Sequence, residues 1–149
     1  MRSFFIPSRI DFTKQKDKPK GYEKMIESKT NEFDTAIRPI ARIFPALCSV
    51  PQSLRSTAEE IRIKCGAPLI IRAGDRNHIM QVTADSALIS ECISAICQNS
   101  VHTYEKDIAN GFITLYGGHR AGICGSAVYS GDRLHTVKNI SSVNIRIAR

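Results

Sequence analysis

The residues most suggestive of chemistry lie in one stretch, YGGHRAGICG at residues 116–125, which places four glycines around a histidine and an arginine. Glycine-rich loops beside basic side chains often hold phosphate, because their backbone N–H groups can approach an anion closely. A P-loop requires G-x-x-x-x-G-K-[ST], and a dinucleotide loop requires G-x-G-x-x-G between a strand and a helix. Neither template fits, because the stretch contains no lysine and strand-like residues flank it on both sides.

The four glycines are better explained by the backbone conformations that they allow. Gly117 and Gly118 are expected to form a turn between two strands. Gly122 and Gly125 fall inside the second strand, where a glycine often marks a bulge or the close approach of another backbone. An alternative stays open, in which a partner or ligand approaches this surface beside Arg120.

The remaining candidates for chemistry do not converge on a site. His119 has no second histidine or carboxylate at ligand spacing, so we expect a histidine in a turn rather than a metal ligand. The other histidines are equally isolated, at positions His78, His102 and His135. We predict no metal and no catalytic residue, and the absence of a nucleophile elbow argues against a hydrolase.

The five cysteines indicate a reducing compartment rather than a disulfide framework. Their number is odd, no C-x-x-C occurs, and most flank apolar residues in the manner of buried free thiols. They lie at Cys48, Cys65, Cys92, Cys97 and Cys124.

Helices are predicted in four regions. Apolar residues recur every three or four positions over residues 33–47, but Pro39 and Pro45 should break that helix. A short helix is predicted around residues 54–60. A longer one should begin with Thr83 as N-cap and run to about Gln98. A shorter one is predicted over residues 102–110, followed by Gly111 as the residue that ends it.

Strands are predicted on both sides of the long helix. Residues 61–64, 69–72 and 78–83 should form a small meander. After the helices come strand-like segments at residues 112–116, two strands joined by a hairpin loop at residues 130–132, and a separate final strand, VNIRIAR. The sum is an α+β domain over residues 31–149, with a small mixed or antiparallel sheet and packed helices.

The charge of the chain is uneven. Its net charge is +7, and residues 1–29 alone hold eight Lys or Arg against four Asp or Glu. Residues 1–30 lack an apolar period and are predicted to be a basic, disordered leader. No apolar run approaches the roughly 20 residues that span a bilayer, and the apolar stretch near the start is too short for a signal peptide. We therefore expect a soluble, non-spanning protein.

Three segments together are more specific than any composition argument. EEIRIKCGAPLIIRAG, YEKDIANGFITLYGGHRAGICGSAV and VKNISSVNIRIAR occur in this order and at these spacings. Over about residues 58–149 they closely resemble the amino-terminal region of the stage III sporulation protein AA family. The resemblance implies an ATPase of the mother cell, related to the motor ATPases of type II and type IV secretion, which energises the channel joining mother cell and forespore.

The resemblance also implies what this chain lacks. In the family, the NIRIAR region leads into an ATPase domain that binds ATP and Mg, whereas this sequence contains no Walker A motif. It therefore resembles the amino-terminal domain alone, from a truncated gene or a cloned fragment. The implied partners are the ATPase domain, neighbouring subunits of an oligomeric ring and membrane proteins of the channel. The implied location is the mother-cell cytoplasm, including its membrane periphery.

By analogy with the secretion motors, arginines of this domain approach the nucleotide or the domain interface. The candidates are Arg120, Arg146 and Arg149, and the alternative is that all three are ordinary solvated arginines. A competing function is a small basic nucleic-acid-binding module, favoured by a pI near 9.4. The sequence lacks an aromatic-basic strand signature, which weighs against nucleic acid as a partner.

Overall fold

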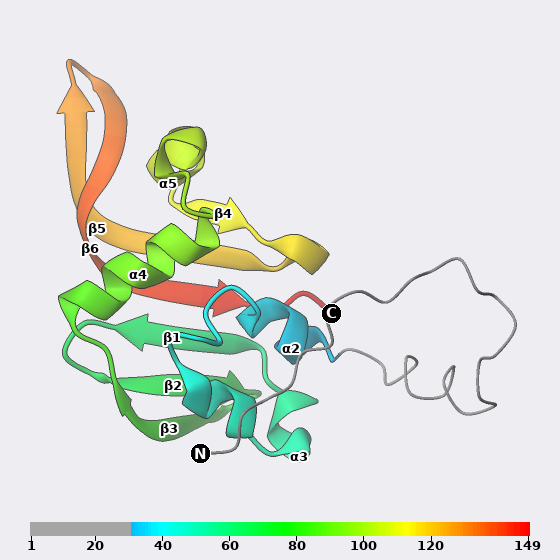
Figure 1. Ribbon diagram of the computed structural model, residues 1–149. Coiled ribbons are helices and arrows are strands. Elements are labelled where there is room, and N and C mark those ends of the chain that lie inside the picture. Colours follow the sequence, from blue (N-terminus) through cyan, green and yellow to red (C-terminus); the bar gives the residue numbers. More distant parts are fainter. Residues whose placement is uncertain (1–30) are drawn as a thin grey trace, which may run out of the picture. The chain divides into compact units, whose positions relative to one another are not determined.

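The computed structural model describes residues 31–149, and the predicted basic leader at residues 1–30 lies outside the described residues. The described part is one unit in which six antiparallel strands form a single sheet (Figure 1). Helices and short helical turns connect the strands, so the α+β prediction is confirmed.

The sheet has the order β3-β2-β1-β6-β5-β4, and all its strand pairs are antiparallel. The strands are β1 (Glu60–Lys64), β2 (Pro68–Ala73), β3 (Arg76–Thr83), β4 (Phe112–Thr114), β5 (Arg120–Ser130) and β6 (Arg133–Arg146). The predicted meander is therefore present as β1 to β3. The last strand of the chain lies at the centre of the sheet, between the meander and the β4–β5 pair.

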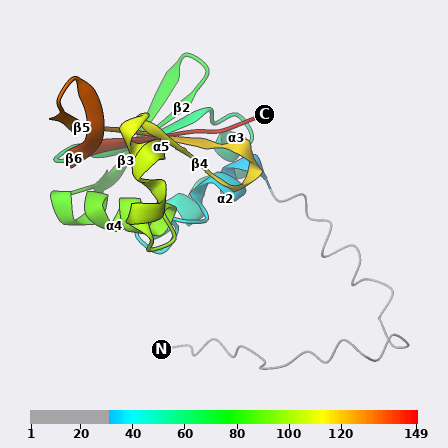
Figure 2. The same cartoon turned by 90° about the horizontal axis from the view of Figure 1, so that it is seen from above.

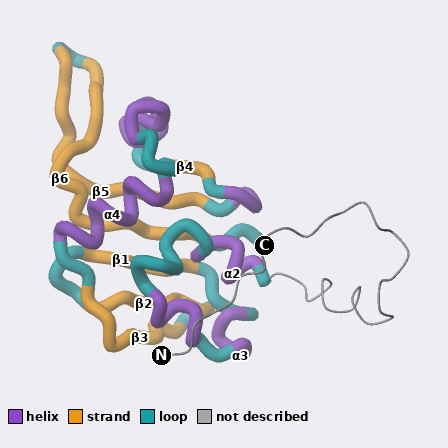
Figure 3. Tube along the Cα trace, in the orientation of Figure 1, coloured by secondary structure: helices purple, strands orange, loops and turns teal. Residues whose placement is uncertain are grey.

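The predicted separate strand VNIRIAR is wrong, because it continues the second strand of the hairpin. β6 runs without interruption for 14 residues. Its register against β5 shifts between Cys124 and Ser126, and Asn139 adopts a left-handed φ of 47°. Such a bulge bends a strand without ending it. Beyond the bulge, β5 and β6 continue past the other strands as a two-stranded hairpin (Figure 3).

The first helical region is broken, as predicted. α2 (Glu32–Ile37) begins at Asn31, whose side chain accepts a hydrogen bond from the N–H of Phe33 at 3.1 Å. It ends before Pro39, and a 3₁₀ turn, η1 (Pro45–Ser49), follows. The next helix, α3 (Gln52–Arg55), is earlier and shorter than predicted, because pairing with β2 and β6 draws Glu60 into β1.

The long helix α4 (Ser86–Ile96) is capped by Asp85 rather than by the predicted Thr83. The Asp85 carboxylate accepts a hydrogen bond from the N–H of Leu88 at 2.8 Å, while Ala84 still forms a bridge to Cys65. The chain then passes through a 3₁₀ turn, η2 (Val101–Tyr104), and α5 (Glu105–Ala109). Gly111 follows with a φ of 86°, in the left-handed conformation expected after a helix end.

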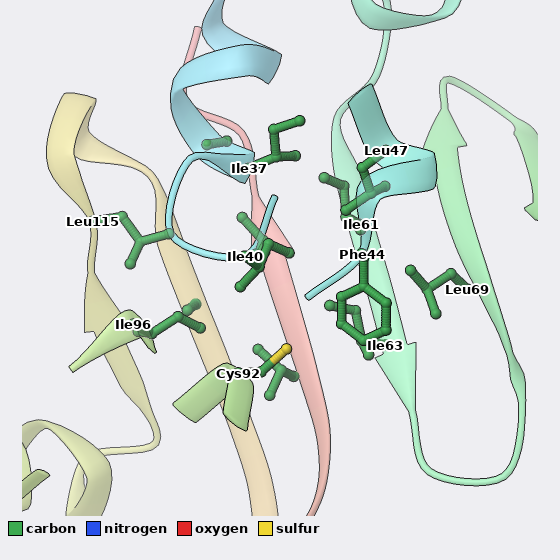
Figure 4. Close-up of a cluster of buried hydrophobic side chains, with 14 of the residues drawn as sticks. Ile37, Ile40, Phe44, Leu47, Ile61, Ile63, Leu69, Cys92, Ile96 and Leu115 are labelled. Carbon is green, nitrogen blue, oxygen red and sulfur yellow. The ribbon is translucent and has the colours of Figure 1, made fainter. Parts of the chain in front are cut away.

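The helical side of the sheet holds the hydrophobic core. α2 and α4 lie on the same side of the sheet (Figure 2). Side chains from the first helical region and from α4 meet those of β1 and β2 (Figure 4), and the largest buried ones include Phe44, Ile40, Ile61 and Leu69. Strand alternation turns Ile61 and Ile63 into this core, and it turns the other residues of β1 to the opposite face. Because α2 and α4 do not cover that face, we call it the uncovered face.

Candidate functional site

The glycine stretch forms the corner between β4 and β5. A 3₁₀ turn, η3 (Tyr116–Gly118), connects the two strands, and Gly117 and Gly118 have φ values of 85° and 81°. The corner is closed by the N–H of Leu115, which donates to the carbonyl of His119 at 2.7 Å. Left-handed backbone at two successive residues is a conformation that glycine adopts with little strain.

His119 is fully buried next to this corner, although it is polar. Its Nδ1 accepts a hydrogen bond from the N–H of Ala148 at 2.9 Å, which places the proton of a neutral imidazole on Nε2. Nε2 lies 3.4 Å from Oε2 of Glu32 at the start of α2. Among the described residues Nε2 has no hydrogen-bond partner, so the imidazole bonds the residues after β6 and only lies next to the start of α2.

Sequence spacing did not reveal this arrangement, because the carboxylate lies 87 positions before the histidine and belongs to another element. The sequence feature that marks this corner is Gly117. A Cβ there would lie 2.9 Å from Nε2 of His119 and 3.2 Å from Cγ2 of Thr35. The glycine corner thus packs tightly against its own domain.

The two glycines inside β5 differ in their surroundings. A Cβ at Gly125 would lie 2.6 Å from the carbonyl oxygen of Lys138 and 2.8 Å from Cγ1 of Val137. A Cβ at Gly122 would have its nearest contact at 3.6 Å, an ordinary van der Waals distance. The close approach of another backbone is therefore a property of Gly125, at the bulge where the hairpin leaves the sheet.

Two of the three candidate arginines lie directly opposite each other. Arg120 of β5 and Arg146 of β6 are cross-strand partners, and Glu60 of β1 is the partner of Arg146 on its other side. Both arginines are exposed on the uncovered face of the sheet. The Glu60 carboxylate is engaged elsewhere, since its Oε2 accepts from Nη2 and Nε of Arg62 at 2.9 and 3.0 Å.

Arg120 also contacts an aromatic ring of the edge strand. Its guanidinium carbon lies 5.1 Å from the ring centroid of Phe112, within the range of a cation–π interaction. The third candidate, Arg149, lies apart from this pair. Its guanidinium donates to the backbone carbonyls of Ser56 and Ala58, the latter at 2.6 Å, and so ties residue 149 to the segment between α3 and β1.

The cysteines and carboxylates offer no grouping for a metal within residues 31–149. All five cysteines are free, but only Cys92 and Cys97 are buried, so the expectation that most are buried is wrong. Burial, together with Glu91 nearby, raises the pKa of the Cys92 thiol to about 12. Burial also raises the pKa of Cys97. Both thiols are therefore poor nucleophiles in the folded protein, because the thiolate is the reactive form.

The described helices are short, and none of those between residues 31 and 149 is long and apolar enough to cross a membrane. The longest, α4, has 11 residues.

Comparison with known proteins gives a consistent family match. A family model described as sporulation stage III, protein AA, matches residues 42–149. Stage III sporulation protein AA of Bacillus subtilis (strain 168) is 32% identical, and the match covers 74% of this chain and 38% of that protein. The chain therefore spans well under half the length of this relative.

Among solved structures, the chain is similar to the X-ray structure of the Legionella pneumophila ATPase DotB. The TM-score is 0.41 at 15% sequence identity, and the match covers 77% of this chain and 29% of that chain.

Proposed function

Because this chain belongs to the stage III sporulation protein AA family, we propose that it is a non-catalytic amino-terminal domain of an ATPase of that family. In this role it serves the assembly of subunits and couples ATP turnover in the rest of the protein to movement. The ATPase in turn energises the channel between mother cell and forespore.

The observation that carries this proposal is the arginine pair on the uncovered face of the sheet. Arg120 and Arg146 are cross-strand neighbours of like charge, an arrangement that costs stability in an isolated sheet. Within residues 31–149 neither forms an ion pair with a carboxylate. Such a pair is explained if an anionic group of another domain or subunit lies against it in the assembled protein, since arginine binds carboxylates and phosphates through two parallel hydrogen bonds.

In this proposal ATP hydrolysis takes place outside this domain, because the domain lacks the groups that phosphoryl transfer needs. Phosphoryl transfer depends on a loop that cradles the phosphates and on side chains that hold Mg²⁺. The sequence contains no Walker A motif, and its glycine-rich corner packs on His119 and Thr35 of its own domain. In this proposal ATP and Mg²⁺ bind to the part of the family that the chain does not match, and this domain acts on them through contacts across an interface.

The proposal places the protein in the cytoplasm of the mother cell, next to the membrane proteins of the channel. Its immediate partners are the ATPase domain and neighbouring subunits of the same ring. Arg149 has a structural role in the isolated domain, through its bonds to two carbonyls, so the interface role is proposed for Arg120 and Arg146.

The test is a hybrid protein, in which residues 31–149 replace the matching segment of the Bacillus subtilis relative. We expect the hybrid to hydrolyse ATP and assemble, the same protein lacking the segment to lose both, and this chain alone to show no turnover. Steady turnover by the isolated chain, abolished by substituting one of its residues, would contradict the proposal. So would full turnover and assembly without the segment.

A further inference from the structure

A pocket of about 230 Å³ lies on the helical side of the domain, and the proposed function does not use it. Four segments converge on it: the end of α2, the end of α4, η2, and the stretch from the end of β4 into η3. Sites for small molecules usually enclose about 300–1,000 Å³. This pocket is therefore too small for a nucleotide or a comparable cofactor, and its size suits a single ring or a single side chain.

The floor of the pocket is apolar. Pro39, Ile96 and Leu115 line it, and the last two are only 4% and 7% exposed. Ile96 and Leu115 also belong to the hydrophobic core, and Figure 4 shows them among its side chains. A group that enters the pocket therefore meets a closely packed apolar surface, which favours an aliphatic or aromatic stem.

The walls and rim of the pocket are polar. The polar residues that line it are Thr35, Arg38, Gln98, Tyr104, Thr114 and Tyr116. None of their side chains forms a hydrogen bond with another described residue. Tyr116 is 82% exposed at the rim, whereas Tyr104 packs against the core. An apolar floor with a few convergent polar groups is the usual composition of a binding site.

Arg38 is the charged residue in the described lining of the pocket, and no carboxylate between residues 31 and 149 pairs with it. Asp34 lies four positions earlier, at the spacing that allows an ion pair across one helical turn. Its carboxylate is instead held by Nη1 of Arg55 at 2.8 Å. The guanidinium of Arg38 is therefore available to an anion.

The end of α4 has a strained backbone beside the pocket. Gln98 has a φ of 52°, a left-handed conformation that glycine adopts with less strain at a helix end. The N–H of Gln98 donates to the carbonyl of Ala95 at 3.1 Å, and the N–H of Asn99 donates to that of Ser94 at 2.7 Å. These bonds satisfy helix-end carbonyls that would otherwise repel an anion. The amide of Gln98 is left to the pocket, and a ligand that binds this amide would explain the strain.

We infer that this pocket binds a carboxylate carried on a short apolar stem, with Arg38 on the carboxylate and the amide of Gln98 beside it. Arginine binds a carboxylate through two parallel hydrogen bonds. A phosphate group carries a charge of about −1.5 to −2 at neutral pH, which one guanidinium does not balance, so a monoanion fits better. This chemistry is found in a free small acid and in the carboxyl terminus of a polypeptide that ends in an apolar residue. The site lies opposite the face that carries Arg120 and Arg146, so it is independent of the proposed function.

The test compares two probes that differ in charge but hardly in shape, phenylacetate and phenylacetamide. Each is titrated into the full chain labelled with heavy nitrogen, and nuclear magnetic resonance follows the backbone amide signals. We expect phenylacetate to shift the signals of residues around the pocket in a saturable manner, and phenylacetamide to bind at least severalfold more weakly. Equal affinity of the two probes, no saturable shift, or shifts confined to the surroundings of Arg120 and Arg146 would overturn the inference.

Two variants assign the binding to named side chains. Arg38→Gln should weaken phenylacetate binding about tenfold or more, because it removes the charged partner of the carboxylate. Arg42→Gln, at an exposed position outside the pocket lining, is the matched control and should leave the affinity unaltered. Equal affinities of these two variants would overturn the inference.

Gln98→Gly separates binding from folding. It should weaken phenylacetate binding severalfold while the thermal midpoint stays the same or rises, since glycine relieves the left-handed strain. A higher midpoint with unaltered affinity would show that Gln98 has no role in the pocket, and that part of the inference would be wrong.

A second pair of probes distinguishes the two sources of the carboxylate. Acetyl-alanyl-phenylalanine with a free carboxyl group is compared with phenylacetate, and its amidated form is the control. Tighter binding of the peptide acid than of phenylacetate would support a polypeptide carboxyl terminus, and equal or weaker binding would support a free small acid. Equal binding of the peptide acid and its amide would overturn the recognition of a carboxylate.

Discussion

The two faces of this sheet are built from the same strands, yet they differ in burial and in the residues that they carry. On β1, Ile61 and Ile63 are fully buried under the helices, while Arg62 between them projects from the uncovered face. β6 repeats the contrast with a buried Ile145 next to an exposed Arg146. The covered face holds the domain together, because burying apolar surface is the main stabilising term in folding. The uncovered face carries the exposed Arg120 and Arg146, for which an interface role is proposed.

The largest difference in stability should appear when a phenylalanine on each face is replaced by alanine. Phe44 is 1% exposed in the core, and Phe112 is 38% exposed on the open face. We expect Phe44→Ala to lower the free energy of unfolding by about 3–5 kcal/mol, through lost burial and a cavity. Phe112→Ala should cost about 1 kcal/mol or less. Chemical denaturation of both variants tests this, and equal losses would show that the open face is as tightly packed as the core.

A second prediction concerns the buried imidazole of His119, which bonds the backbone after β6. His119→Leu removes the acceptor for the Ala148 N–H and leaves that group unpaired in a buried site. The free energy of unfolding should fall by about 1–3 kcal/mol. His78→Leu, at an exposed position on β3, serves as the control and should have little effect. If both variants unfold at the wild-type denaturant concentration, the hydrogen bond from Ala148 to His119 contributes nothing.

The two glycines of β5 give a comparison within one strand. Gly125→Ala should lower the free energy of unfolding by about 1–2 kcal/mol, because its Cβ would meet the backbone of Lys138 at 2.6 Å and the hairpin must shift. Gly122→Ala should be tolerated, since the nearest atom would lie 3.6 Å away. Thermal unfolding of the two variants provides the measurement. If Gly122→Ala lost more stability than Gly125→Ala, the tight backbone contact would lie at Gly122 and the prediction would be wrong.

A small effect is expected for Arg146 in the isolated domain. Arg146→Ala should change the free energy of unfolding by no more than about 0.5 kcal/mol, as is usual for an exposed position. In the hybrid protein the same change should reduce ATP turnover or assembly. Marked destabilisation of the isolated chain would make Arg146 a structural residue, and wild-type turnover in the hybrid would make it an ordinary surface charge.

The smallest effect concerns the thiols, whose reactivity should differ with burial while stability at neutral pH is unaffected. At pH 8 a thiol reagent should modify Cys48, Cys65 and Cys124 readily and Cys92 far more slowly, because burial raises the pKa of Cys92 to about 12. The folded state then holds this proton more tightly than the unfolded state, where a thiol has a pKa near 8.5. Stability should therefore fall only as the pH rises above that unfolded value. Rapid labelling of all five cysteines at pH 8 would show that α4 opens easily.

The sequence by itself determined the local structure and the family. Alternation of apolar and charged residues specified which side of β1 and of the end of β6 is buried, because successive strand residues point to opposite faces. The two prolines predicted the broken first helix, and Gly111 predicted the end of α5. The same alternation was enough to turn Arg146 away from the core. These features depend on neighbours within a few positions, and such neighbours can be read directly from a sequence.

Only the tertiary structure decided how distant segments meet. It placed Arg120 opposite Arg146 and brought His119 next to Glu32 and into a hydrogen bond with Ala148. It also directed Arg149 to backbone carbonyls more than 90 positions away. It also merged two predicted strands into β6, because pairing with β5 continues across a bulge that sequence patterns do not reveal. Contacts of this kind depend on strand order and register, which residue periodicity leaves undetermined. For that reason Arg120, Arg146 and Arg149 could be named from the sequence, but it could not show that Arg120 and Arg146 lie side by side while Arg149 lies apart from them.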